Sequence, residues 1–205
     1  MGNLHKGHMA LIDKAKSYDS HVSASIFINP LQFNDASDFK NYPKSLDDDI
    51  ALLSKHGCDS LFVPDSSILD NIKEIKAPDT ALYLCGMNRP GHFDGVLTIV
   101  NKLFEITKPT RSFFGKKDFQ QLTLIKNFVI ENNLPIEIIS VDTVRELNGL
   151  AMSSRNNRLS EFDREKASKL YETLSLIKDN SSNLSNEIIK SHKDELTKKG
   201  FDIDY

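Results

Sequence analysis

Short apolar runs alternate with longer amphipathic segments from the first residues of the chain to about Val141. The run at 22–28 is β-branched and mostly apolar, as expected for a strand that is buried on both faces. Further runs of strand length lie at 60–63, 81–84, 111–114 and 136–141. Segments with a helical spacing of apolar residues lie at 8–18, 45–56, 93–107 and 119–132. This alternation predicts an α/β fold in which a parallel sheet carries helices on both faces.

The pattern changes after Thr143. Two amphipathic segments at 160–178 and 184–198 predict helices, and a polar stretch at 179–183 separates them. The last residues, 200–205, have the pattern of the first half of a strand. We therefore expect one domain at 1–143 and a small α+β domain at 144–205.

Composition narrows the classes of partner. A formal net charge of -3 over 205 residues gives no general attraction to phosphate backbones, so we expect no nucleic-acid partner. No apolar run approaches the roughly 18 residues that cross a bilayer, and no basic stretch precedes an apolar one at the N-terminus. Cys58 and Cys85 are far apart, which fits a reducing compartment. These features predict a cytoplasmic protein with no membrane partner.

The segment 1–8, Met-Gly-Asn-Leu-His-Lys-Gly-His, gives the clearest chemical signal. His5 and His8 are three residues apart at the start of a helix, so they can share one face. The helix N-terminus disfavours an imidazolium cation and attracts a phosphate, and Gly7 allows a close approach of the backbone. Two imidazole N–H donors and free backbone amides would suit an α-phosphate that gains charge in a transition state. A solvated helix start is the simpler alternative, and a zinc pair would lack a third ligand.

Two polar segments follow predicted strands. Asn29 and Gln32 lie beyond the run at 22–28, where open α/β sheets bind ligands, and their amides suit a small hydroxy-acid. A plain Asn-Pro turn is the alternative. The segment 89–95, which precedes a helix, could contact substrate or order a lid.

The segment 115–121, Gly-Lys-Lys-Asp-Phe-Gln-Gln, lies between a strand and a helix. Gly115 allows the turn, Lys117 supplies a point charge for phosphate, and Asp118 suits ribose hydroxyls. Asp118 and Gln121 fit a helix capping box equally well, which leaves their function open.

The segment 152–156, Met-Ser-Ser-Arg-Asn, offers hydroxyls for phosphate oxygens and a guanidinium that can contact two oxygens at once. It is similar to the mobile KMSKS-type loop that accompanies HIGH motifs, although Ser-Ser-Arg alone is common in loops. The acidic run Asp47–Asp49 could collect Mg²⁺, but acids in the first turn of a helix are also expected from the helix dipole. Ser45 with Asp48 fits a capping box there. We assign no residue as a metal ligand.

Taken in order, the runs MGNLHKGH, SIFINPLQF, RPGHFDGV, GKKDFQQL and MSSRNNRLS resemble the pantothenate synthetase (pantoate–β-alanine ligase) family of the HIGH-motif nucleotidyltransferase superfamily. The resemblance extends from Met1 to about Leu170 and more weakly to the end. It implies a Rossmann-like sheet and an ATP-dependent ligase that condenses pantoate with β-alanine. The expected path runs through a pantoyl-adenylate and releases AMP and pyrophosphate. ATP, Mg²⁺ and a homodimer are implied as well.

The resemblance also assigns roles to individual residues. His8, His5 and Lys117 are the expected catalytic residues, and Asn29, Gln32 and Gln121 are expected to bind substrate. The expected nucleotide-binding residues are Met1, Gly2, Asn3, Leu4, His5, Lys6, Gly7, His8, Gly115, Lys116, Lys117, Asp118, Val144, Met152, Ser153, Ser154 and Arg155.

Family members usually carry a strand ending in Pro-Thr before the first motif and continue past the end of this chain. The resemblance therefore implies a missing first strand and an incomplete C-terminal lid domain. Lys116 stands where a glutamate is usual. Two alternatives stay open: another HIGH-superfamily nucleotidyltransferase, or an inactive truncated remnant. The amides of Gln32 and Gln121 argue against the first, because a phosphate acceptor would be better bound by Arg or Lys.

Overall fold

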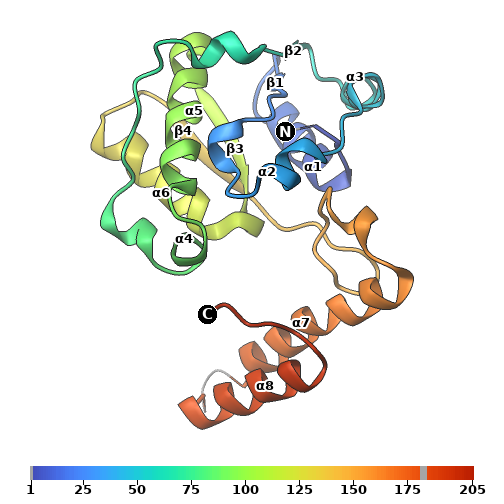
Figure 1. Ribbon diagram of the computed structural model, residues 1–205. Coiled ribbons are helices and arrows are strands. Elements are labelled where there is room, and N and C mark those ends of the chain that lie inside the picture. The colour runs from blue at the N-terminus through green and yellow to red at the C-terminus, as the bar shows by residue number, and fades with distance from the viewer. Residues whose placement is uncertain (1, 181–183) are drawn as a thin grey trace. The chain divides into compact units, whose positions relative to one another are not determined.

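The computed structural model describes residues 2–180 and 184–205. Contacts between residues divide the chain into two compact units, Met1–Asp142 and Thr143–Tyr205, and Figure 1 shows the elements of each. The polar stretch predicted at 179–183 lies partly outside the described residues.

The four strands of the first unit form two parallel pairs (Figure 1). β1 (Ser23–Ser25) pairs with β2 (Ser60–Phe62), and β3 (Arg111–Gly115) pairs with β4 (Glu137–Val141). These strands confirm four of the five predicted runs. Within the described residues, each strand has one strand partner.

The long helices of the first unit confirm the four helical patterns, with bounds that differ by a few residues. They are α1 (Lys6–Lys16), α3 (Leu46–Lys55), α5 (His92–Thr107) and α6 (Phe119–Glu131). Two shorter helices, α2 (Ala36–Lys40) and α4 (Cys85–Asn88), lie in the connections, where the sequence predicted no helix.

The strand predicted at 81–84 is wrong. Asp79–Leu82 forms a 3₁₀ turn, and Leu84 has a left-handed backbone (φ 51°) directly before α4. Gly86 packs so closely on this turn that an added Cβ would lie 1.6 Å from the carbonyl oxygen of Ala81. Within this segment Ala81 is buried in the α5–α6 core, whereas Leu82, Tyr83 and Leu84 are exposed, so the turn contributes one side chain to that core.

Alternate side chains of β3 enter two hydrophobic cores. Phe114 packs on the first core, which α5 and α6 supply with residues such as Val96 and Ile125. Phe113 packs on the second core, which contains Met9 of α1. Successive side chains of a strand point to opposite faces, so helices cover both faces of this pair, as the alternation predicted.

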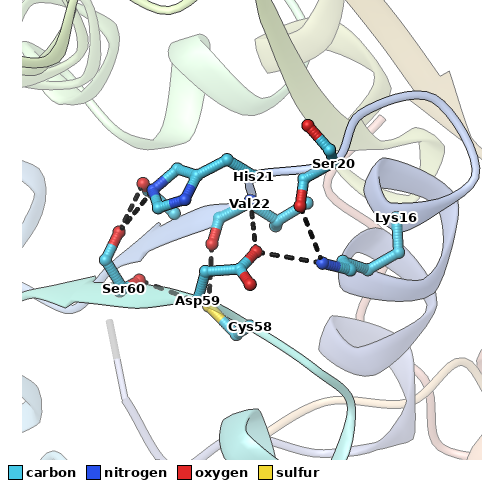
Figure 2. A network of polar contacts seen from close by, with 8 residues as sticks. Lys16, Ser20, His21, Val22, Cys58, Asp59 and Ser60 are labelled. Atoms are coloured by element: carbon cyan, nitrogen blue, oxygen red, sulfur yellow. Dashed lines mark hydrogen bonds and ion pairs between the residues drawn. The ribbon is translucent and has the colours of Figure 1, made fainter.

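A polar network fixes the start of β1 beside the start of β2 (Figure 2). The carboxylate of Asp59 accepts hydrogen bonds from the Val22 amide at 2.7 Å and from the Lys16 ammonium at 3.0 Å. The hydroxyls of Ser23 and Ser60 lie 2.6 Å apart. These contacts lie at the amino ends of the strands, so they leave the carboxyl ends to the polar segments that follow them.

A cavity of about 470 Å³ separates β1 from β3, and side chains of α1 and α5 complete its walls. Backbone groups of a parallel strand point alternately to its two sides. The backbone groups of Val22 and Ile26 hydrogen-bond toward the β2 side. The backbone N–H and C=O groups of Ser23 and Ser25 are therefore directed toward the cavity. Among the described residues, no strand pairs with these edges.

The second unit contains a short hairpin-like turn and two helices. An antiparallel bridge joins Arg145 to Ala151, and Gly149 turns the chain with φ 91°. α7 (Glu161–Asp179) and α8 (Asn186–Lys198) confirm the two predicted helices. The strand expected at 200–205 is wrong, since residues 201–205 have no regular structure and no neighbouring strand among the described residues satisfies their backbone.

No helix in the described part of the chain combines the length and the apolar character needed to span a bilayer.

Candidate active site

The N-terminus of α1 brings the two histidines together. His5 is the N-cap residue, and its Nδ1 accepts a hydrogen bond from the Gly7 amide at 3.1 Å. The His5 amide in turn donates to Nδ1 of His8 at 3.2 Å, which completes a capping box made of two imidazoles. The ring centroids lie 4.0 Å apart. Local helix capping therefore fixes the geometry of what we call the imidazole pair, His5 and His8.

The same hydrogen bonds assign the tautomers of the imidazole pair. Because both Nδ1 atoms accept hydrogen bonds, each neutral ring carries its proton on Nε2. Both rings therefore have an Nε2–H donor that the capping box does not use.

Partial burial favours the neutral form of both rings. The pKa of His8 is lowered to about 3, first by desolvation and then by the positive charges of a protonated His5, of the N-terminus and of Lys117. Desolvation, followed by Lys117, also lowers the pKa of His5. Lys117 is thus close enough to act electrostatically on both rings, and its ammonium lies 3.6 Å from the carboxylate of Asp118.

The segment 1–8 was expected to offer free backbone amides, but four of its amides are already hydrogen-bonded within the chain. The amides of Asn3 and Leu4 donate to the carboxylate of Asp49, at 2.9 and 2.7 Å. Those of His5 and Gly7 donate to the imidazole pair. The imidazoles and Lys117 are therefore the better-placed groups for an anion. Met1, also expected to bind nucleotide, lies outside the described residues.

The turn after β1 presents Gln32 and buries Asn29. The Asn29 side chain, 1% exposed, accepts from the Leu31 amide at 3.2 Å and donates to the Gly95 carbonyl at 3.1 Å. Gln32 ends the 3₁₀ turn Pro30–Gln32, and its backbone oxygen lies 2.9 Å from Nδ1 of His92. Within the described residues the Gln32 side-chain amide has no hydrogen-bond partner, so it is available to a ligand.

The segment 115–121 forms the 3₁₀ turn Lys116–Asp118 and enters α6. Asp118 occupies the N-cap position without a side-chain capping bond, so the capping alternative is wrong for this residue. Lys116 pairs with Asp142 at 2.6 Å. The two neighbouring glutamines differ: Gln120 binds the backbone of Thr80, Tyr83 and Cys85, whereas Gln121 has no side-chain partner among the described residues.

In the second unit, the loop with Met152–Arg155 is held by its neighbours. The Met152 amide donates to the Val144 carbonyl at 3.0 Å, and Ser153 Oγ accepts from the Arg155 amide at 3.2 Å. Asn156 donates to Glu146 at 2.8 Å, and Arg164 contacts both carboxylate oxygens of Glu146 at 2.7 and 2.8 Å. The bidentate hydrogen bonds from Arg164 lower the pKa of Glu146. They also fix the base of the loop.

The chain is similar to one family of known proteins over its whole length. A family profile described as pantoate-beta-alanine ligase matches residues 1–205. The pantothenate synthetase of Acinetobacter baylyi is 43% identical over the whole chain, which covers 75% of that protein. That of Methylobacillus flagellatus is 46% identical, again over the whole chain and 76% of the relative.

The chain belongs to the pantoate–β-alanine ligase family.

Solved structures of the pantoate–β-alanine ligase family share the fold. The ligase from Francisella tularensis, solved in complex with β,γ-ATP and β-alanine, superposes with a TM-score of 0.88 at 41% identity, covering all of this chain and 77% of that one. Pantothenate synthetase from Thermus thermophilus gives 0.88 at 40% identity, covering 96% of this chain and 74% of that one. The predicted Rossmann-like α/β fold is therefore confirmed.

The sequence did not indicate the hydrogen bonds that Asp49 accepts from Asn3, Leu4 and Ser45. The capping box predicted at Ser45 and Asp48 is wrong, because Ser45 makes no side-chain cap bond and its hydroxyl instead donates to Asp49 at 3.2 Å. The described residues contain no group of three or more His, Cys, Asp or Glu side chains that could hold a metal ion, so a metal cluster at Asp47–Asp49 is wrong as well.

Proposed function

We propose that the chain catalyses the ATP-dependent condensation of pantoate with β-alanine, through a pantoyl-adenylate. The observation that carries this proposal is the neutral imidazole pair beside Lys117, with its two Nε2–H donors not used in capping. The family match and the relatives' names support the substrates.

In the first step, a carboxylate oxygen of pantoate attacks the α-phosphorus of ATP. A new P–O bond forms, and the bond to the β-phosphate oxygen breaks, so pyrophosphate leaves. Charge grows on the α-phosphate oxygens, where the Nε2–H groups of His5 and His8 and the Lys117 ammonium would stabilise it. Neutral imidazoles suit this role because they donate hydrogen bonds without needing a proton from solution.

In the second step, the amine of β-alanine attacks the acyl carbon of the adenylate. A C–N bond forms, the acyl C–O bond breaks, AMP leaves and the amine loses a proton. The amides of Gln32 and Gln121 supply donors and acceptors for the hydroxy-acid and the amino acid. Holding both reactants in one site supplies much of the rate, and water must be excluded because the mixed anhydride hydrolyses.

We assign the remaining nucleotide contacts by family resemblance. In the first unit they are Gly2, Asn3, Leu4, Lys6, Gly7, Gly115, Lys116 and Asp118, and in the second they are Val144, Met152, Ser153, Ser154 and Arg155. Asn29 would act by holding the turn of Gln32, since its own amide is engaged.

We infer three further properties from the family. Mg²⁺ would accompany the ATP phosphates, and we assign it no protein ligand. A homodimer is expected. Static light scattering of the purified chain would test this by measuring the molar mass in solution. The cytoplasm is the expected compartment, and the free thiols of Cys58 and Cys85 agree with it.

The deciding experiment is ATP–pyrophosphate exchange. We expect exchange that depends on pantoate and falls by about 100-fold or more in His8→Ala, because a transition-state donor is lost. Exchange that needs a phosphorylated acceptor instead would identify another nucleotidyltransferase, and no exchange from a folded, ATP-binding chain would contradict the proposal.

A further inference from the structure

Asp49 is an acidic side chain that the fold buries. It lies on α3 with 2% of its surface exposed, whereas its neighbour Asp48 is exposed. A buried carboxyl group is costly unless hydrogen bonds replace its hydration. The partners of Asp49 therefore indicate what it does.

Those partners belong mainly to the loop that precedes the imidazole pair. Oδ2 accepts from the Asn3 amide at 2.9 Å, and Oδ1 accepts from the Leu4 amide at 2.7 Å. The Ser45 hydroxyl donates to Oδ1 at 3.2 Å, from the residue before α3. A carboxylate from one helix thus fixes a loop more than 40 residues away in sequence.

This loop has an uncommon backbone. Gly2 and Asn3 both have left-handed φ angles, of 89° and 50°, and a Cβ added to Gly2 would lie 3.2 Å from Oδ2 of Asp49. Two successive residues in this conformation need contacts that hold them there. Asp49 supplies two such contacts.

We propose that Asp49 is a positioning residue for adenylate formation, which holds the loop Gly2–Leu4 so that His5 enters α1 with its imidazole beside that of His8, the two rings tilted by 40°. This inference rests on the proposed function. Leu4 directly precedes His5, so a shift of the loop moves the N-cap and both rings with it. Misplacement of catalytic groups by about 1 Å costs on the order of 100-fold in rate.

The test is Asp49→Asn, which keeps the size of the side chain but replaces one acceptor oxygen by an amide donor. We expect pantoate-dependent exchange at saturating substrate to fall about 10- to 100-fold, with the KM for ATP changed less than about threefold. Asp48→Asn is the matched control, since it removes the same charge from the exposed neighbour, and it should retain wild-type exchange.

A second readout does not depend on activity. Titration of the His8 ring by NMR should give a pKa near 3 in the wild-type chain and a value closer to 6.5 in Asp49→Asn, because a displaced ring is better solvated. If the wild-type chain showed no exchange, the proposed function would fail while this titration still decided the role of Asp49. Wild-type exchange and an unchanged His8 titration in folded Asp49→Asn would overturn the inference.

If Asp49→Asn does not fold, Ser45→Ala provides the measurement. It removes one donor to Oδ1 and leaves both loop amides bound, so we expect exchange to fall by about three- to tenfold with the KM for ATP nearly unchanged. Full exchange in a folded Ser45→Ala chain, together with a wild-type His8 titration, would overturn the inference as well.

Discussion

The imidazole pair owes its chemistry to capping bonds and burial together. Most N-caps use a hydroxyl or carboxylate, whereas here the acceptor is an imidazole Nδ1. The capping box fixes the Nδ1 atoms as acceptors, and desolvation keeps the rings uncharged. The sequence predicted low basicity at this position from the helix dipole, but burial is the largest cause.

The low pKa of His8 makes folding depend on pH. Between about pH 6.5 and 3 the unfolded chain binds a proton on this ring that the folded chain excludes, so the free energy of unfolding falls as pH falls through that window. The loss is at most about 1.4 kcal/mol per pH unit.

We therefore expect urea unfolding at pH 5.0 and 7.5 to show a smaller pH difference for His8→Gln than for the wild-type chain, by about 2 kcal/mol. His192→Gln, on α8, controls for the loss of one imidazole. Equal pH differences for His8→Gln and the wild-type chain would contradict the burial of this ring.

The adjacent residues Gln120 and Gln121 provide a matched pair of substitutions. Gln121→Ala should weaken pantoate-dependent exchange by about 10-fold or more and leave the melting temperature within about one degree, because only a ligand contact is lost. Gln120→Ala should lower the free energy of unfolding by about 1–3 kcal/mol, because it leaves backbone groups of the 79–85 turn unpaired. Exchange that is reduced equally by both changes would contradict this division of roles.

Single residues show why part of the site could not be predicted. The histidines, Lys117 and the glutamines were predicted as site residues because they lie in short motifs beside predicted strands and helices. Asp49 was not recognised as a loop anchor, since its bonds to Asn3 and Leu4 join positions more than 40 residues apart. No local pattern distinguishes Gln120 from Gln121, and only the path of the 79–85 turn does.

At the scale of elements, the clearest predictions came from periodicity. The apolar spacing of α5 and α6 and the apolar run of β3 each encode burial on their own, so their positions followed from the sequence. The segment 81–84 is equally apolar but short, and its backbone conformation is set by contact with Gly86. Short apolar runs do not by themselves distinguish a strand from a turn, and here three of the four apolar side chains are exposed.

The cavity between β1 and β3 predicts an alternating pattern of amide hydrogen exchange. Amides directed at a strand partner, those of Ala24, Ile26 and Ser112, should exchange slowly. Amides directed at the cavity, those of Ser25 and Phe113, should exchange at least about 10-fold faster, because no strand bond protects them.

NMR-detected exchange at neutral pH would resolve these residues one by one. The helical amides of α5 serve as the internal control for global opening. Uniform protection along β1 and β3 would show that both edges are closed.

At the scale of the first unit, β3 joins two cores that are otherwise built from different helices. Phe113 and Phe114 are adjacent in sequence but contribute to opposite cores. The strand that leads into the Lys117 turn therefore depends on the packing of both cores.

Ligand binding gives a test on the whole molecule. A ligand that binds only the folded chain raises the free energy of unfolding by about 2.7 kcal/mol at 100 times its Kd. We expect ATP to raise the melting temperature of the chain, and Lys117→Ala to reduce that increase. The same buffer with pyrophosphate in place of ATP, at equal concentration, is the control for anion binding alone. A folded chain that ATP does not stabilise would favour the inactive remnant.

Gly95 lies where α5 meets the turn that carries Gln32. The α5 backbone meets the Pro30–Gln32 turn so closely there that a Cβ would lie 2.2 Å from the Leu31 carbonyl oxygen. Any larger side chain at this position would push α5 away from the turn that carries Gln32. The absence of a side chain at Gly95 therefore sets how closely helix and turn can approach.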